Sequence, residues 1–431
     1  MLKNLLIQGG RVIDPASNFD AVADVAIANG KVLAVGAAPS GFVADETIAA
    51  QGCIVAPGLV DLCARLREPG QEHKGMLQSE LAAAVAGGVT ALVCPPDTDP
   101  VLDEPGLVEM LRYRARSLNQ ARVFPLGALT RGLKGDVLTE MHALTDAGCV
   151  GFSQAETALA NTQVVQRALQ YASTFGYTVW LRPQDYHLGK GVAASGPFAT
   201  RMGLGGVPVA AETIALHTIF ELMRATKARV HLCRLSSAAG VDLVRQAKAE
   251  GLPVTCDVSI NSLHLSDVDM GYFDIRTRLT PPLRQTRDRD ALRAALADGT
   301  IDALVSDHMP VGEDEKALPF AEAEPGATGL ELLLPLGLKW AGECGVALPQ
   351  LVRLLTTGPA ALVQSKSAQG GPGGLVVGGV ADVCVFDPQA AWVVGAETLR
   401  SRSHLTPFEG YELLGRVRAT VAHGHLAYQA A

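Results

Sequence analysis

Short apolar runs alternate with amphipathic segments of helical period through the middle of this chain of 431 residues. The alternation is typical of βαβ units, in which a helix returns the chain to the next strand of a parallel sheet. Because eight such units fill roughly 300 residues, they predict an α/β fold of the (β/α)8 TIM-barrel type. The expected strands are 59–62, 89–94, 122–129, 149–153, 177–182, 229–235, 252–259 and 301–307. The expected helices include 77–86, 106–117, 163–175, 212–226 and 239–250.

Both ends of the chain have a pattern of short β-strands instead. Asn29-Gly30 lies between the apolar runs 22–27 and 31–35, and this dipeptide favours a hairpin because both turn positions need positive φ. Similar runs recur over 381–428, after a glycine-rich stretch at 370–379. We therefore expect the two ends to combine into a small β-sandwich domain. The predicted division is 1–57 and 368–431 for the β domain, with 58–367 for the barrel.

Composition and charge restrict the class of protein. Hydrophobic residues make up 48% of the chain and charged residues 19%, which is typical of a globular protein with a large core. The formal charge of −8 argues against nucleic acid or an anionic membrane as the main partner. No apolar run approaches the roughly 18 residues that cross a bilayer, and we expect no signal peptide. The eight cysteines are scattered singly, so we expect buried, reduced thiols in a cytoplasmic protein.

The C-terminal ends of the strands are where a barrel of this type carries its chemistry. The residues at those ends are Cys63, Arg65, Gln154, Ala155, Arg182, Arg234, Asp307 and His308. Three arginines in these positions do not suit a metal site, because guanidinium groups stay protonated and cannot ligate.

Several segments elsewhere agree with the sequence motifs of one known family. They are Leu66-Arg67-Glu68-Pro69-Gly70, residues 93–100, Pro281-Pro282-Leu283-Arg284, residues 299–303, Gly329-Leu330-Glu331 and Thr406-Pro407-Phe408-Glu409-Gly410. Together they resemble the dihydroorotases of the amidohydrolase superfamily over nearly the whole chain. The resemblance implies a barrel whose strand ends hold catalytic metal.

The metal site that the resemblance implies is nearly absent from this sequence. The family's ligand positions correspond here to Cys63, Arg65, Gln154, Ala155, Arg182, Arg234 and Asp307. The resemblance implies histidines at 63, 65, 182 and 234 and a pair of aspartates at 154 and 155, so only Asp307 keeps the family's residue. Since zinc needs three or four donors around one point, we expect no catalytic metal and no other cofactor.

The arginines allow two interpretations. In the first, the guanidinium groups replace the positive charge of the metal and pair with Asp307, with Asp185 or Asp257 as further partners. In the second, the surplus positive charge binds a carboxylate metabolite. Arg67, at the family's substrate-carboxylate position, together with Asp97 and His308 would form this residual anion site. The family has asparagine at 97, which weakens the second interpretation.

Cys63 also allows two interpretations. It is either a buried thiol or a nucleophile that nearby arginines activate. No histidine lies close in sequence to act as its base, which favours the buried thiol.

The family's sequence segments are present, but most of its metal ligands are replaced. This combination resembles one class within the family. These are the inactive dihydroorotase homologues that assemble with aspartate transcarbamoylase in bacterial pyrimidine biosynthesis. The resemblance implies a non-catalytic subunit, in a homo- or hetero-oligomer, that supports the assembly and activity of the transcarbamoylase catalytic subunit. The alternatives are an active cyclic-amide hydrolase with a rebuilt site and a regulatory protein that binds a metabolite.

Overall fold

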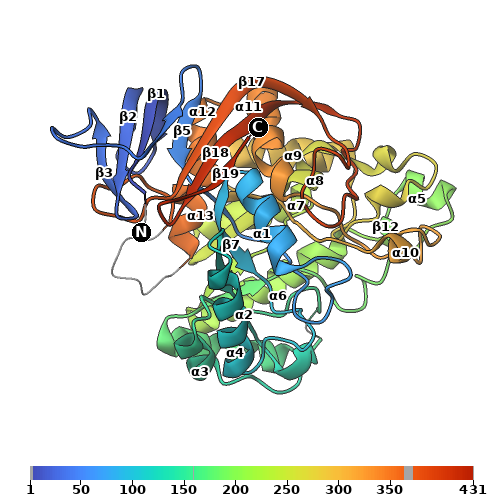
Figure 1. Cartoon of the computed structure of the whole chain (residues 1–431). Coiled ribbons are helices and arrows are strands. Elements are labelled where there is room, and N and C mark those ends of the chain that lie inside the picture. The colour runs from blue at the N-terminus through green and yellow to red at the C-terminus, as the bar shows by residue number, and fades with distance from the viewer. Residues whose placement is uncertain (1–2, 159, 364–371, 431) are drawn as a thin grey trace.

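The barrel occupies the middle of the chain in the computed structural model, which describes residues 3–158, 160–363 and 372–430 (Figure 1). Its strands are β6 (Leu59–Asp61), β7 (Val89–Cys94), β8 (Arg122–Pro125), β9 (Gly127–Ala128), β10 (Phe152–Ser153), β11 (Thr178–Leu181), β14 (Arg229–Leu232), β15 (Val254–Ser259) and β16 (Ala303–Val305). Neighbouring strands pair in parallel in the order β6-β7-β8 and β9-β10-β11-β14-β15-β16. The predicted third strand, 122–129, is thus divided into β8 and β9 at Leu126.

Hydrogen bonds between the first and last strands close the barrel. Ala64 and His308 form a parallel bridge, in which the Arg65 N–H donates to the His308 carbonyl over 2.9 Å. The His308 N–H in turn donates to the Cys63 carbonyl over 3.2 Å. All eight predicted strand positions lie in this closed sheet, so the predicted (β/α)8 barrel is confirmed.

Helices surround the sheet, and in α4 (Thr162–Phe175) capping residues mark both ends. The larger ones are α1 (Leu77–Ala86), α2 (Pro105–Ser117), α3 (Met141–Ala147), α4 (Thr162–Phe175), α6 (Ala210–Thr226), α7 (Ala238–Ala249), α9 (Thr286–Ala297), α11 (Leu333–Cys344) and α12 (Leu348–Leu355). The shorter ones include α5 (Pro197–Arg201), α8 (Ile260–His264), α10 (Glu313–Lys316) and α13 (Thr357–Leu362). In α4, the Asn161 side chain accepts the N–H groups of the first turn, and Gly176 ends the helix with φ of 70°.

The interior of the barrel is filled by side chains from alternate strand positions. Val60, Val93 and Val305 are fully buried there, beside Trp180 and Cys63. These side chains form a packed core inside the barrel, as is typical of eight-stranded barrels of this type.

The two chain ends combine into one small β domain, as predicted. Its strands are β1 (Leu5–Asp14), β2 (Phe19–Ala28), β3 (Lys31–Gly36), β4 (Glu46–Ala49), β5 (Ile54–Pro57), β17 (Val383–Val393), β18 (Glu412–Ala422) and β19 (His425–Gln429). They pair in the order β19-β18-β17-β5-β1-β2-β3, with β4 also on β1, and enclose a core that includes Ile7, Val55 and Val385. The predicted hairpin is present, since Asn29 and Gly30 have φ of 50° and 76°.

The division into domains remains a prediction. The first predicted boundary, between residues 57 and 58, falls between β5 and β6. The second, between 367 and 368, lies outside the described residues, as do Gly370 and Gly371 of the glycine-rich stretch.

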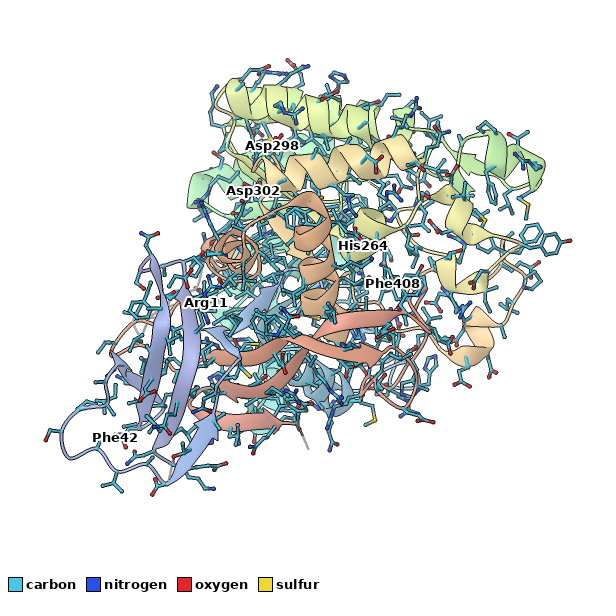
Figure 2. The ribbon with its side chains drawn as sticks, turned by 90° about the horizontal axis from the view of Figure 1, so that it is seen from above. Arg11, Phe42, His264, Asp298, Asp302 and Phe408 are labelled. Atoms are coloured by element: carbon cyan, nitrogen blue, oxygen red, sulfur yellow. The ribbon has the colours of Figure 1, made fainter. Side chains whose placement is uncertain are left out.

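The segment before β18 packs against the barrel. Phe408 is fully buried, and its ring lies edge-on to that of His264 in α8 with centroids 6.2 Å apart (Figure 2). Residues 406–410, one of the segments that carry the family resemblance, therefore contact the barrel just before the chain enters β18.

The cysteines and the helices test two further expectations. All eight cysteines are free, but Cys344 is exposed and Cys233 half-buried, so the expectation that all are buried is wrong for these two. Cys344 is the last residue of α11, where the amphipathic helix meets solvent. None of the helices in the described ranges has both the length and the apolar character needed to cross a membrane.

A buried ion pair joins the barrel to the β domain. Arg122, the first residue of β8, pairs with Asp382, which precedes β17 and is 3% exposed. Asp382 also accepts the His423 N–H over 2.9 Å. The joint therefore depends on a carboxylate with little access to water.

We expect Asp382→Asn to destabilise the protein by about 3 kcal/mol, because it leaves the Arg122 guanidinium unpaired in a buried position. Asp20→Asn removes an exposed partner of Arg11 and should cost less than about 1 kcal/mol. Urea unfolding of the two variants beside the parent protein measures the difference. Equal losses would show that the buried pair does not stabilise the joint.

Candidate functional site

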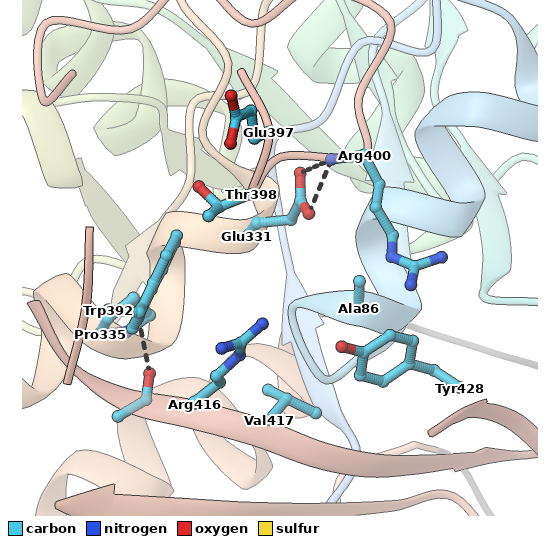
Figure 3. A pocket seen from close by; sticks show the side chains of 11 residues that line it. Ala86, Glu331, Pro335, Trp392, Glu397, Thr398, Arg400, Arg416, Val417 and Tyr428 are labelled. Atoms are coloured by element: carbon cyan, nitrogen blue, oxygen red, sulfur yellow. Dashed lines mark hydrogen bonds between the residues drawn. The ribbon is translucent and has the colours of Figure 1, made fainter. Parts of the chain in front are cut away.

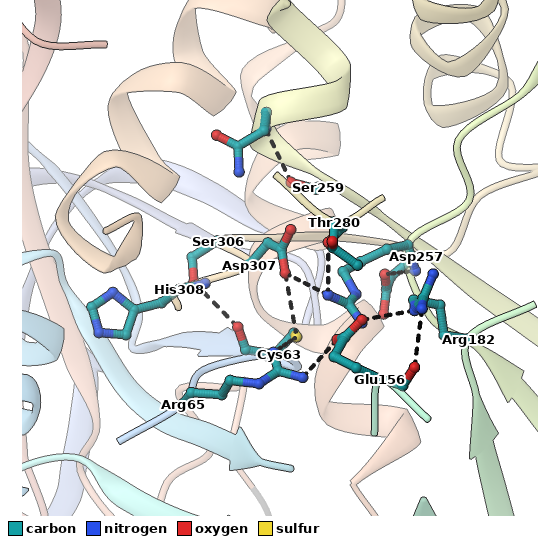
Figure 4. Close-up of polar contacts among 12 residues, drawn as sticks. Cys63, Arg65, Glu156, Arg182, Asp257, Ser259, Thr280, Ser306, Asp307 and His308 are labelled. Carbon is teal, nitrogen blue, oxygen red and sulfur yellow. Dashed lines mark hydrogen bonds and ion pairs between the residues drawn. The ribbon is translucent and has the colours of Figure 1, made fainter. Parts of the chain in front are cut away.

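Side chains from five strand ends and one neighbouring loop meet at the mouth of the barrel (Figure 4). We call them the mouth cluster, which consists of Cys63, Arg65, Asp97, Glu156, Arg182, Arg234 and Asp307. Arg182 directly follows β11, and Asp307 follows β16 by two residues. Because parallel strands end on the same face, residues far apart in sequence come within hydrogen-bond distance there.

Glu156 is the centre of the mouth cluster. Its Oε1 accepts a hydrogen bond from Arg65 Nη2 over 2.7 Å and another from Arg234 Nη2. Its Oε2 lies 2.7 Å from Arg182 Nε, and the Glu156 carbonyl accepts from Arg182 Nη2 over 3.1 Å. One carboxylate thus contacts all three guanidinium groups. Burial raises the pKa of Glu156, but the charges of Arg234, Arg182 and Arg65 lower it by more. The pKa therefore lies well below its ordinary value.

Asp307 pairs with one of the arginines, as the first interpretation expects. Arg234 Nη1 donates to Asp307 Oδ1 over 3.0 Å and to the Thr280 carbonyl over 3.1 Å. The Cys63 thiol lies 3.8 Å from the same carboxylate oxygen. Burial raises the pKa of Asp307, and the nearby Arg234 and Arg65 compensate only in part. The predicted contact between Asp307 and an arginine is confirmed.

The charges of the mouth cluster balance. Arg65 Nε donates to Asp97 Oδ2 over 2.8 Å, which adds a third carboxylate to Glu156 and Asp307. The three arginines therefore face three acids. The Arg65 and Arg234 side chains are only 3% and 2% exposed, and burial at that level requires this pairing. Arg182 Nε and Arg234 Nε lack a hydrogen-bond partner among the described residues, whereas the other guanidinium nitrogens of these three arginines have one.

Two residues from the expected metal positions lie outside the mouth cluster. Gln154 accepts from Thr130 Oγ1 over 3.0 Å and donates to the Leu133 carbonyl over 2.7 Å. Ala155 packs against Ala128 and Leu133. These contacts hold the loop after β10 in a conformation that turns Glu156 toward the arginines.

The prediction that Asp185 or Asp257 pairs with the guanidinium groups is wrong. Asp257 Oδ1 accepts the backbone N–H of Arg234 over 2.7 Å, and its Oδ2 bonds to His231. Asp185 accepts the N–H groups of His187 and Leu188 instead of pairing with Arg182. Glu156, which has the role expected of them, was missed. Its signal was an acidic residue three positions beyond the strand end, in a sequence with three arginines at other strand ends.

The side chains at the mouth do not fit a catalytic metal. The potential donors are the Cys63 thiol and the carboxylates of Asp97, Glu156 and Asp307. Each of them lies beside an arginine of the mouth cluster, whose guanidinium group repels a dication. Burial raises the pKa of the Cys63 thiol, with Asp307 also raising it and Arg234 and Arg65 opposing, so this thiol stays protonated. A protonated thiol is neither a good ligand nor a nucleophile.

One group of three potential ligands does occur in the described part of the chain. The ligand atoms of His231, Cys233 and Asp257 lie within 4.8 Å of one another. Both ring nitrogens of His231 are already hydrogen-bonded, to Thr255 Oγ1 and to Asp257 Oδ2, each over 2.9 Å. Burial also raises the pKa of Cys233. These bonds explain the group as a buried polar network of the barrel interior.

The residues of the predicted anion site have partners inside the chain. Arg67 donates to the Pro310 carbonyl over 2.8 Å and to Gln71, while Asp97 pairs with Arg65. His308 is fully buried and bonds to Glu80 over 2.8 Å, away from the mouth cluster (Figure 4). Arg67 Nη2 has no hydrogen-bond partner among the described residues, so binding of an anion by Arg67 stays a prediction.

Replacing Glu156 by alanine should destabilise the protein by about 3 kcal/mol, because three buried guanidinium groups lose a shared carboxylate. Formate at high concentration should restore part of the lost stability by entering the space, and should stabilise the parent protein less. Thermal unfolding with formate or with chloride at equal ionic strength measures the rescue. Glu221→Ala, at an exposed pair with Arg224, is the control. No formate-specific gain in Glu156→Ala would contradict a central role for Glu156.

Comparison with known proteins identifies the family. Residues 52–239 match the family of Dihydro-orotase-like proteins, and residues 207–428 match the Amidohydrolase family. A "Dihydroorotase-like protein" of Pseudomonas aeruginosa is 46% identical over 424 residues, which are 98% of this chain and 99% of that protein. A "Dihydroorotase" of a Geobacter species is 42% identical over 431 residues, 99% of this chain and 100% of that protein.

A solved structure shows the same fold. The L-hydantoinase (dihydropyrimidinase) of Arthrobacter aurescens superimposes with a TM-score of 0.86 at 24% identity, over 99% of this chain and 96% of that one. The family matches and the two relatives cover nearly the full length, whereas this likeness concerns the fold alone. The chain belongs to the dihydroorotase-like proteins of the amidohydrolase family.

Proposed function

We propose that this chain is a non-catalytic dihydroorotase-like subunit that supports the assembly and activity of aspartate transcarbamoylase in pyrimidine biosynthesis. The observation that carries the proposal is the Glu156 carboxylate, which contacts three arginines in the mouth where the family holds metal. In this mouth, guanidinium groups that are paired with carboxylates stand where the family holds its metal.

The loss of hydrolysis follows from the chemistry of the side chains. Hydrolysis of a cyclic amide by this family relies on a metal that lowers the pKa of a bound water. Here the corresponding positions carry guanidinium groups, which supply positive charge but cannot bind and ionise water. Asp307, which could accept a proton, is committed to Arg234. The mouth cluster therefore replaces the charge of the metal without its chemistry.

The role as a partner subunit is supported by what the chain retains. The barrel is closed and the β domain complete, although the mouth has lost its ligands. A chain that keeps its fold without turnover is best explained by contacts made through its surface. With a formal charge of −8, it favours a partner whose docking face is rich in lysine and arginine. We also infer a cytoplasmic location, because its eight cysteines are free thiols.

Purified protein should contain far less than one zinc ion per chain and should hydrolyse dihydroorotate at the background rate, because the donor set is missing. Elemental analysis and a hydrolysis assay with added zinc measure both. The double variant Cys63→His, Arg65→His should remain inactive, since Arg182, Arg234 and Glu156 are unchanged. Stoichiometric zinc with turnover in the parent protein would instead support the alternative of an active cyclic-amide hydrolase.

The protein should form a stable complex with its cognate aspartate transcarbamoylase, larger than either component in size-exclusion chromatography. A stable interface needs roughly 800 Å² from each partner. Because steering by opposite charges is screened by salt, association should slow in moderate salt. An unrelated acidic protein of similar size is the control. Separate elution at low salt, with unchanged transcarbamoylase activity, would contradict the proposed role and favour a metabolite-binding regulator.

A further inference from the structure

A pocket lies between the barrel and the strands of the β domain, away from the mouth cluster (Figure 3). Its volume is about 250 Å³, and its walls come from α1, α11 and the β17–β19 strands. Ala86 at the end of α1 lines it, just before β7 enters the barrel, whereas the mouth cluster lies where the strands end. Neither the family assignment nor the proposed function accounts for this pocket.

Two arginine side chains in the pocket have no ion-pair partner among the described residues. Arg416 projects from β18 between Trp392 and Tyr428, and Arg400 approaches from the opposite wall (Figure 3). The Arg400 guanidinium lies over the Tyr428 ring, 5.0 Å from its centroid. By contrast Arg418, two residues farther along β18, is paired with Asp387 over 2.8 Å. The two pocket arginines therefore keep hydrogen-bond donors free for an anion.

The acidic residues of the lining form no ion pair with these arginines in the part of the chain that the structure describes. Both oxygens of Glu331 accept the backbone N–H of Arg400 over 2.9 Å, and one also accepts that of Ser401 over 3.3 Å. Burial raises the pKa of Glu331 to about 7, although these backbone hydrogen bonds and the charge of Arg400 oppose the rise. Glu397 is exposed to solvent, where water screens its charge. The pocket is accordingly more favourable to an anion than to a cation.

Aromatic side chains give the pocket flat walls. Trp392 Nε1 donates to the Gly415 carbonyl over 3.2 Å, which fixes the indole before any ligand enters. Tyr428 is half-buried beneath Arg400. An apolar cavity of about 150 Å³ accommodates benzene, and pockets for drug-sized ligands begin near roughly 300 Å³. The volume here therefore suits one ring with a small substituent.

We propose that this pocket binds a small aromatic carboxylate, whose carboxylate group is held by Arg400 and Arg416 and whose ring lies against Trp392 and Tyr428. Guanidinium groups bind carboxylates through paired, charge-assisted hydrogen bonds, and the prior fixing of the indole and of Arg400 reduces the entropy lost on binding. The site is independent of the mouth cluster, so its occupancy does not depend on the transcarbamoylase role.

Trp392 provides a direct readout of binding. The chain has three tryptophans, and Trp180 and Trp340 are fully buried, so quenching by a bound ring reports Trp392. Nicotinate is a suitable probe because nicotinamide has the same ring without the charge. Isothermal titration calorimetry on the full chain gives the affinities of both compounds.

Nicotinate should quench Trp392 fluorescence and bind at least about tenfold more tightly than nicotinamide. Arg400→Gln and Arg416→Gln should each weaken nicotinate binding about tenfold, while the control Arg418→Gln should not. All three positions lie at or near the surface, and thermal unfolding checks that each variant is folded. Equal affinity for the two compounds, no binding of nicotinate, or equal losses in all three arginine variants would overturn the proposal.

Discussion

The architecture of the barrel mouth depends on the contact of the Glu156 carboxylate with three guanidinium groups. Buried guanidinium groups cannot deprotonate, so three of them in one place are stable only if carboxylates surround them. Glu156 meets this requirement with one side chain, and Asp97 and Asp307 complete the balance. The low pKa of Glu156 keeps the contact charged throughout the physiological range.

Three residues of the mouth have a left-handed backbone conformation. Ala155, Arg234 and Asp307 have φ of 50°, 56° and 51°, in the left-handed region that costs a residue with a side chain about 1 kcal/mol or more. The surrounding sheet and loops hold them there, and each turn directs the chain toward the mouth. The Arg234 and Asp307 side chains that these turns place at the mouth pair with each other over 3.0 Å.

Sequence alone predicted most of the fold and part of the site. Periodicity placed α4 and the eight strand positions, because this signal is local. The third strand breaks at Leu126, between Pro125 and Gly127, two residue types that interrupt strands, and this signal was overlooked. The contacts of Glu156 could not be predicted from its neighbours in sequence, because its partners lie 26 to 91 residues away. The exposure of Cys344 likewise reflects which face of α11 meets solvent.

The most direct test of this account is a crystal structure of the protein grown with excess zinc and measured at the zinc absorption edge. We expect Glu156 to bridge Arg65, Arg182 and Arg234, and we expect no anomalous zinc peak at the strand ends. A zinc peak coordinated by Asp307 and Cys63, with the arginines turned away from Glu156, would contradict it.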